Sequence, residues 1–307
     1  GAWLTQAGAL LANPQVAAVA PRVRSGASSG PVRRWGQVRP ALDLGPKRSA
    51  VRPRTRVPYV PTAALVVRRD ALEAVDGFND RMLLGEDVDL VWRLHDAGWT
   101  IRYEPDLVVE HRVRPNLRRW ILQRFRYGRS NAVLAEAHHQ HVAALELTSW
   151  NAVLMLGLAP WRPARAAAAV AAAAGPIVLR ARLANRCEHP GRMALILQRD
   201  GVLYALDATA QALRRSYWPV VAVSSIQSRR ARWLSLATVG AAMIRWLVQG
   251  RPVPLHRWLA AGAADDLAFG AGVWWESLRR RSFRALRLHL SRLDRFLPDD
   301  IPPVTRQ

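Results

Sequence analysis

The stretch from Gly85 to Trp99 reads GEDVDLVWRLHDAGW and decides the fold of the chain around it. Three acidic residues stand near its start, apolar residues then recur three or four positions apart, and Gly98 follows. Acids are favoured in the first turn of a helix, apolar residues at this spacing share one face, and glycine commonly ends a helix. The stretch therefore predicts a short helix whose inner face carries Leu90, Leu94 and Ala97.

The segments before this helix add a strand and a second helix. The apolar run Ala63–Val67 predicts a buried strand, and Arg69–Val75 predicts a short helix. Asp76-Gly77 then predicts a turn, because glycine adopts the left-handed backbone conformation without strain.

Further segments complete an α/β pattern. Gly1–Ala12 predicts an amphipathic helix, and the apolar Val16–Val23 predicts a strand buried on both faces, as in a parallel sheet. After the acidic helix, Thr100–Tyr103 and Leu107–Glu110 predict two short strands that lead to His111. Helices and strands that alternate in this way favour a wound sheet covered by helices.

The composition limits the partners of the chain. Its 307 residues carry a formal net charge of +22, and of the 45 basic residues only Lys47 is a lysine. This excess creates a positive field that attracts phosphates, nucleic acid or anionic lipid. A nucleic-acid-binding module is disfavoured, because the arginines are dispersed and the aromatic residues fall in apolar runs. The single Cys187 excludes a disulfide within the chain and suits a reducing compartment.

Arg24–Arg56 is a long basic connection rich in glycine, proline and serine. Connections of this length inside a domain are usually functional or disordered. The segment is either a mobile loop beside a substrate or a solvated insertion, and we expect the insertion.

The composition becomes more apolar from Leu145. Three apolar or alanine-rich runs follow, Leu145–Trp161, Ala164–Leu179 and Trp233–Val248. Each is shorter than, or only near, the roughly 20 residues needed to cross a bilayer. A transmembrane hairpin, helices lying on a membrane and buried soluble helices all remain open. Interfacial attachment is favoured by flanking arginines and by tryptophans near the run ends, Trp150, Trp161, Trp218 and Trp246.

Between these regions, Arg112–His141 contains the sequence QRFRYG at Gln123–Gly128. An aromatic ring can stack on a sugar, and a neighbouring arginine can bind hydroxyl or phosphate oxygens. An amphipathic basic helix with an aromatic face explains the pattern equally well. His138, His139 and His141 follow, but no cysteine or carboxylate pair nearby completes a metal site, so we expect a solvated turn.

Together these motifs resemble a known enzyme family. Five elements occur in its order: Gly77-Phe-Asn-Asp, Gly85-Glu-Asp-Val-Asp-Leu-Val-Trp-Arg-Leu, Ala97-Gly-Trp, Tyr103-Glu-Pro-Asp and His111. They resemble the second half of family 2 glycosyltransferases of the GT-A fold. Gln123-x-x-Arg126-Tyr127 is similar to the Gln-x-x-Arg-Trp motif of sugar-polymerising members, with tyrosine in place of tryptophan.

Two later segments, Arg214–Pro219 and Ala264–Trp275, resemble the glycosyltransferase group of the mycofactocin system, as does Phe125–Gly128. The resemblance implies an α/β fold, the C-terminal half of a GT-A mixed, mainly parallel sheet flanked by helices, over residues 1–112. A mostly α-helical region, associated with a membrane in one interpretation, is expected over residues 113–290, with a tail at 291–307. The nucleotide-binding half is expected to lie before Gly1, so the fragment alone is expected to be inactive.

The resemblance also implies catalytic roles. Inverting sugar transfer needs a base for the acceptor hydroxyl and a divalent cation for the departing diphosphate. Asp87 is implied as the base, and His111 as a metal ligand beside an Asp-x-Asp expected just before Gly1. A mixed nitrogen and oxygen set suits Mn²⁺ better than Mg²⁺. At a helix N-terminus Asp87 is expected to have a lowered pKa, because the helix dipole favours its anion.

Several residues are implied to bind substrate. Glu86 and Asp89 would hold acceptor hydroxyls or anchor the helix, and Trp92 and Arg93 would either shape the acceptor floor or serve packing. On the following basic helix, the implied sugar-binding residues are Gln123, Arg126 and Tyr127.

The implied donor is a nucleotide-diphosphate sugar, UDP-glucose by resemblance, and the implied acceptor is the mycofactocin precursor or a related small molecule. The expected location is the cytoplasm, at the inner face of the cell membrane, with an anionic membrane surface and no nucleic acid as partner. The alternative is a membrane-associated scaffold or interaction protein derived from a glycosyltransferase that lacks a complete catalytic apparatus.

Overall fold

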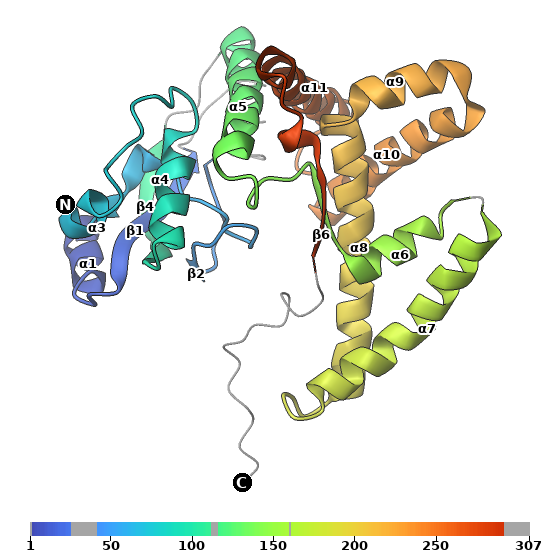
Figure 1. The fold of residues 1–307 in the computed structure, drawn as a ribbon, viewed down its shortest axis with the longest axis horizontal. Helices are drawn as coiled ribbons and strands as arrows, with labels where there is room; N and C mark the ends of the chain where they lie inside the picture. Colours follow the sequence, from blue (N-terminus) through green and yellow to red (C-terminus); the bar gives the residue numbers. More distant parts are fainter. Residues whose placement is uncertain (1, 26–41, 112–115, 160, 292–307) are drawn as a thin grey trace. The chain divides into compact units, whose positions relative to one another are not determined.

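The computed structural model describes residues 2–25, 42–111, 116–159 and 161–291 of the chain (Figure 1). The chain divides into two compact units. Unit 1 comprises residues 1–142 and 243–285, and unit 2 comprises residues 143–242 and 286–307. Unit 1 runs through both domains expected from the sequence, so the boundary expected at residue 112 stays a prediction.

A mixed sheet forms the centre of unit 1. Its strand order is β2 (Ser49–Ala50), β4 (Thr100–His111), β1 (Val16–Ser25) and β3 (Val66–Val67). The long pairing of β1 with β4 is parallel, whereas β3 and β2 add short antiparallel pairings at the two edges. The predicted mixed, mainly parallel α/β sheet is therefore confirmed.

β1 is buried over most of its length, as the apolar run Val16–Val23 predicted. β4 is one strand rather than the two short strands expected. Its pairing with β1 shifts register between Glu104 and Val108, and it continues on both sides of this irregularity. A bulge therefore interrupts the ladder where a break between two strands was expected.

The strand expected at Ala63–Val67 was mostly wrong. Thr62–Ala64 forms a 3₁₀ turn (η1), and only the half-buried Val66 and Val67 pair with β1. Pro61 is the N-cap of this turn, and its fixed φ suits the entry to a helical turn. An apolar run does not by itself distinguish such a turn from a strand.

The described helices of unit 1 are α1 (Ala2–Leu10), α3 (Arg69–Glu73), α4 (Glu86–Asp96), α5 (Leu117–Ala137) and α11 (Leu255–Arg280). α1 and α4 pack against the strands of the sheet, and α5 packs along α11. α4 buries Leu90 and Leu94 as predicted, but Ala97 lies just beyond the helix and is exposed. Gly77 follows α3 with a φ of +63°, which confirms the predicted turn.

The second half of the expected solvated insertion packs on the sheet. Arg22 of β1 forms an ion pair with Asp43 at 2.8 Å, and the Tyr103 hydroxyl donates to the carbonyl of Gly45 at 2.7 Å. Val51 is buried beside β2. The insertion prediction was therefore wrong for residues 42–56, whereas residues 26–41 lie outside the described part of the chain.

Unit 2 is mostly helical and contains a small parallel pair of strands, β5 (Leu145–Thr148) and β6 (Leu288–Ser291). Only Ser291 of β6 lies in the segment expected to be a tail, the rest of β6 lies in the region expected to be mostly helical, and residues 292–307 lie outside the description. The 3₁₀ turn η2 (Arg284–Leu286) precedes β6. The helices are α6 (Ser149–Leu156), α7 (Arg162–Leu183), α8 (Pro190–Arg215), α9 (Trp218–Gln227) and α10 (Arg229–Val248), of which α10 ends in unit 1.

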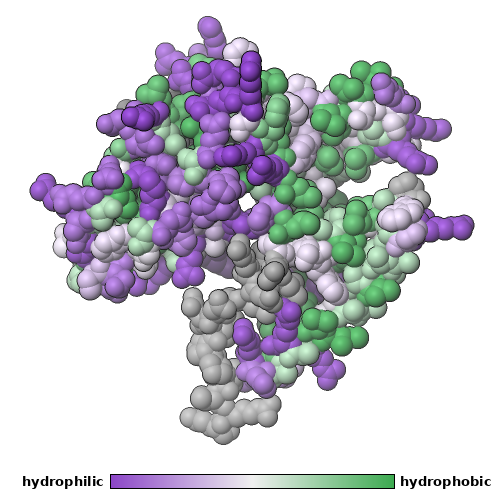
Figure 2. All heavy atoms as spheres, viewed as in Figure 1, coloured by the Kyte–Doolittle hydropathy of each residue, from purple (hydrophilic) through white to green (hydrophobic). Residues whose placement is uncertain are grey.

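Many large apolar side chains of unit 2 are exposed, and Figure 2 shows hydrophobic surface over its helices. Among the described helices, α7 is the one whose length and composition would allow it to cross a membrane. Of the four tryptophans expected at an interface, Trp161 is exposed, whereas Trp246 packs beside the buried Trp120 and Trp258 in unit 1. The most exposed apolar side chains of unit 2 include Leu158, Val170, Ile177, Val223, Ile226 and Trp233.

Candidate active site

The acidic motif begins α4 through a glycine that no other residue replaces easily. Gly85 is the N-cap residue and has a left-handed φ of +84°. A Cβ at this position would also lie 3.0 Å from the Leu134 side chain of α5. Backbone conformation and close packing therefore both require glycine here. Gly85 places Glu86 and Asp87 in the first turn of α4 and sets this turn against α5.

Asp87 is half-buried, and its Oδ1 accepts the backbone N–H of Val88 at 2.8 Å. Burial raises the pKa of Asp87 above its ordinary value, and the neighbouring Glu86 charge adds to the rise, although backbone N–H groups oppose it. The lowered pKa expected from the helix dipole was therefore wrong, because desolvation outweighs it. A raised pKa makes Asp87 a stronger base.

Asp89 has a different environment, with only 2% of its surface exposed. Its Oδ1 lies 2.7 Å from His138 Nε2, and its Oδ2 accepts from Arg93 Nε at 2.8 Å. Burial alone would raise the pKa of Asp89, but the hydrogen bonds from His138 and Arg93 outweigh it and lower the pKa. Both carboxylate oxygens are thus engaged in holding α4 in place.

Arg93 and Trp92 also hold α4 in place, through hydrogen bonds to backbone carbonyl oxygens. The Arg93 guanidinium donates to the carbonyl oxygens of Gly77, at 2.7 Å, and of Val75, and so connects α4 to the turn after α3. Trp92 is buried, and its indole N–H donates to the carbonyl of Pro58 at 2.8 Å. These contacts account for both side chains without a substrate.

The implied sugar-binding residues lie near the middle of α5. Gln123 Nε2 donates to the Tyr127 hydroxyl at 2.6 Å, and Arg126 is exposed. Between them, Arg124 is buried, forms an ion pair with Asp265 of α11 at 3.0 Å, and lies over the Tyr127 ring at 5.9 Å. One side of the motif therefore fixes α5 to α11, while Arg126 faces solvent.

His111 ends β4 and is exposed. It belongs to no group of three or more potential metal ligands within the described ranges. Among the described residues His111 is therefore not part of a complete metal site, and its role as a metal ligand stays a prediction. Within the described ranges of the chain, no hydrogen bond or ion pair joins His111 to Asp87 or to the α5 motif.

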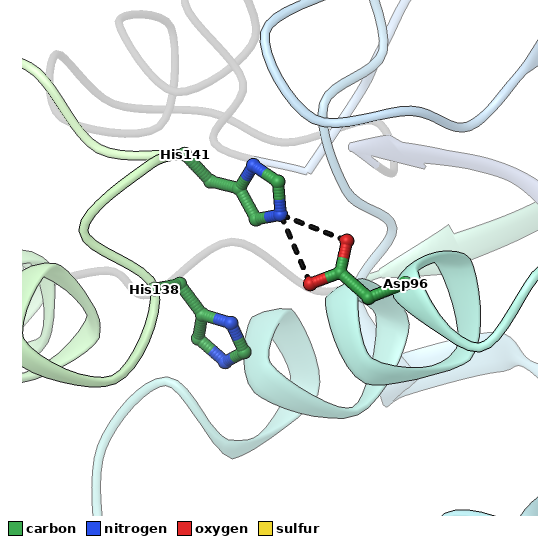
Figure 3. A group of neighbouring side chains, drawn as sticks. All are labelled: Asp96, His138 and His141. Carbon is green, nitrogen blue, oxygen red and sulfur yellow. Dashed lines mark hydrogen bonds and ion pairs between the residues drawn. The ribbon is translucent and has the colours of Figure 1, made fainter.

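The structure also contains a cluster of histidine and carboxylate side chains that the sequence did not predict. Asp96 of α4 joins His138 and His141, which follow α5 (Figure 3). His138 is 6% exposed, so the expected solvated turn was wrong at this residue, whereas His139 is exposed. A signal was present: carboxylates at positions 89 and 96 lie two turns apart on one face of a helix. Their partners, about 45 residues away, could not be read from it.

Comparison with known proteins identifies the family. The model of "Glycosyl transferase family group 2" matches residues 4–248 of the chain. Two curated relatives named "Pre-mycofactocin glycosyltransferase", from Mycobacterium tuberculosis strains CDC 1551 / Oshkosh and ATCC 25618 / H37Rv, are each 35% identical over 297 residues. The alignment covers 93% of this chain and 63% of each relative, so the chain spans less than two thirds of their length. The match includes the sheet, the acidic turn of α4 and the α5 motif, and the chain belongs to glycosyl transferase family group 2.

Proposed function

We propose that the chain provides the acceptor side of an inverting hexosyltransferase, with Asp87 as the catalytic base. The observation that carries this proposal is the half-buried Asp87 carboxylate with a raised pKa at the start of α4. A general base works best when its pKa approaches the working pH. Of the acids in this turn, Asp89 is fully engaged by His138 and Arg93, and Glu86 is exposed.

In the proposed reaction Asp87 takes the proton from an acceptor hydroxyl as its oxygen attacks the anomeric carbon of the donor sugar. The new carbon–oxygen bond forms on one face while the bond to the diphosphate breaks on the other, and the nucleoside diphosphate leaves with the electron pair. Glu86 would orient acceptor hydroxyls from the exposed side of the same turn. Gln123, Arg126 and Tyr127 would contact a sugar ring, with Tyr127 held in place by its hydrogen bond to Gln123.

A divalent cation, Mn²⁺ or Mg²⁺, would neutralise the charge of the departing diphosphate. In this proposal His111 supplies one nitrogen ligand. Within the described ranges His111 belongs to no larger group of ligands, and we propose that further oxygen ligands complete the set. His111 thus fits as one member of a ligand set rather than as a site.

For the substrates, the name of the two relatives supports a precursor of mycofactocin as acceptor. We propose UDP-glucose as donor. We also propose a cytoplasmic location at the membrane surface, because exposed apolar side chains of unit 2 accompany a net charge of +22. Such a surface favours anionic lipid headgroups.

The experiment that tests this function is the transfer of glucose from UDP-glucose to the precursor by the full-length protein. Asp87→Asn should lower the rate by about 10²–10⁴-fold, the usual contribution of a general base. Glu73→Gln, an exposed carboxylate of α3, is the matched control and should keep the parent rate. Unchanged turnover in Asp87→Asn would favour the scaffold alternative, in which this part of the protein has lost catalysis.

A further inference from the structure

We propose that Asp96, His138 and His141 bind a Zn²⁺ ion that fastens the C-terminal end of α4 to the turn after α5. One ligand atom from each of the three side chains lies within 4.8 Å of the others (Figure 3). His141 Nε2 is 3.0 Å from Asp96 Oδ1 and 3.1 Å from Oδ2. This inference does not depend on the proposed transfer activity.

The spacing of these atoms suits an ion. Ligand atoms about 2.0–2.1 Å from a tetrahedral zinc lie about 3.3 Å from one another. The Asp96–His141 pair is already at nearly this separation, and His138 offers a ligand atom within 4.8 Å of both, so the proposed ion requires His138 to move closer. Three protein ligands leave one position for water, which can approach because Asp96 is exposed.

A hydrogen bond to one ring nitrogen fixes the orientation of His138. Its Nε2 is engaged by the buried Asp89 at 2.7 Å, which leaves Nδ1 for the ion. Histidine ligands of metals commonly bond a carboxylate through their second ring nitrogen, and this contact fixes the ring orientation. The Trp92 ring also packs edge-on against both imidazoles, with centroids 5.3 Å apart in each case. The cluster is therefore ordered before any ion arrives.

The ligand types select among metals. Two imidazoles and one carboxylate suit zinc, whereas Mg²⁺ and Ca²⁺ prefer sets made of oxygen. Asp96 lies nine residues beyond Asp87 on α4, a separation of about 14 Å along the helix axis. A zinc ion here would not reach a sugar bound at Asp87. It would instead stabilise the packing of α4 on α5, the two helices that carry the acidic motif and the QRFRYG motif.

The test is a titration of the full-length protein, stripped of metal with a chelator, with ZnCl₂ in a calorimeter. Co²⁺ serves as a spectroscopic probe, because its visible absorption reports the coordination geometry. One zinc site that depends on Asp96 is expected, in addition to any zinc bound at the transfer site proposed around His111. Asp96→Asn and His141→Ala should each weaken zinc binding by about 100-fold or more. Asp96 is exposed, so its substitution preserves the fold even if a histidine variant does not.

Two matched controls make the result specific. His139→Ala removes an exposed histidine from the same turn, and His111→Ala removes the ligand proposed for the transfer site. Neither should change the zinc affinity of this site, and zinc should raise the unfolding temperature of both, but not that of Asp96→Asn. Absence of stoichiometric zinc binding, or equal binding by Asp96→Asn and the parent protein, would overturn the proposal and leave a hydrogen-bonded pair in its place.

Discussion

Gly128 of α5 and Gly272 of α11 each lie against the backbone of the other helix. A Cβ on Gly128 would stand 1.9 Å from the carbonyl oxygen of Phe269, and a Cβ on Gly272 would stand 2.0 Å from that of Phe125. Neither distance is compatible with a side chain. The two helices can approach this closely only because both positions are glycine.

We expect Gly128→Ala to destabilise unit 1 by about 2 kcal/mol or more, because the new methyl group collides with backbone that cannot rotate away. Chemical unfolding followed by circular dichroism measures the change. The matched control is Gly262→Ala, also on α11, where a Cβ meets nothing within 4 Å. That substitution should stabilise the protein by about 0.5–1 kcal/mol, since alanine restricts the unfolded chain. Equal effects at the two sites would contradict the close helix approach.

Glu276 should make stability depend on acid pH. Burial alone would raise its pKa, but the guanidinium groups of Arg279, Arg129 and Arg280 outweigh burial and lower the pKa to about 2. A carboxyl with a depressed folded-state pKa stabilises the fold above its unfolded value of 4.5. This contribution is lost as the pH falls from 4.5 towards 2.

Glu276→Gln should therefore flatten the dependence of unfolding free energy on pH in this acidic range. At neutral pH it should cost about 3 kcal/mol, the usual scale for removing one partner of a buried ion pair. Denaturant unfolding at a series of pH values measures both effects. Glu73→Gln, an exposed glutamate, should retain the parent slope, and a parent slope in Glu276→Gln would contradict the assignment.

Asp89→Asn should loosen the attachment of α4. The substitution removes the charge that pairs with Arg93 and alters the hydrogen bond with the buried His138. We expect a loss of about 3 kcal/mol of stability. Asp80→Asn, at an exposed carboxylate before α4, should change stability little and serves as control. If the two variants unfold at the same denaturant concentration, Asp89 does not anchor the helix.

Asp87 should lower the stability of the folded protein while it supports sugar transfer. Its folded-state pKa is raised, so ionisation disfavours the fold as the pH rises above the ordinary value of 3.8. Asp87→Asn should therefore increase the stability at neutral pH while it lowers transfer. In the parent enzyme, kcat/KM should fall on the acid side with a pKa above 3.8, since only the carboxylate can accept a proton. A less stable Asp87→Asn protein would contradict this account.

Membrane attachment can be tested by sedimentation with vesicles. If the helices of unit 2 lie on a membrane, the full-length protein should pellet with anionic vesicles at low salt and be released at high salt, because salt screens the attraction. Neutral vesicles of the same size are the control. Release by detergent alone would instead indicate that α7, which is long enough, crosses the bilayer.

Short sequence patterns predicted the helices and strands that depend mainly on residues close together in the chain. The spacing of Leu90 and Leu94 and the stop at Gly98 fixed α4 almost to the residue, and the apolar Val16–Val23 marked β1. The prediction of one strand over Ala63–Val67 was wrong, because the run is divided between the 3₁₀ turn η1 and the edge strand β3.

The remainder of the site depends on pairings between distant residues. Asp89 and His138 are 49 residues apart, and nothing in the composition of either segment links them. Likewise, the motif at Gln123–Gly128 resembles a sugar-binding sequence, yet Gly128 is fixed by the backbone of Phe269 on a helix that follows much later. The raised pKa of Asp87 also required knowledge of burial, since the helix dipole alone predicts the opposite direction.

Arg129 and Glu276 are separated by 147 residues, and all of unit 2 between residues 143 and 242 is synthesised between them. At about 5–20 residues per second, the ribosome needs about 7–30 s to cover this interval. During that time α5 exposes Arg124, Gly128 and Arg129 without the helix that covers them. Unit 1 therefore cannot finish folding until residues 143–242 of unit 2 have been synthesised, so a chain that stalls within this stretch leaves unit 1 incomplete.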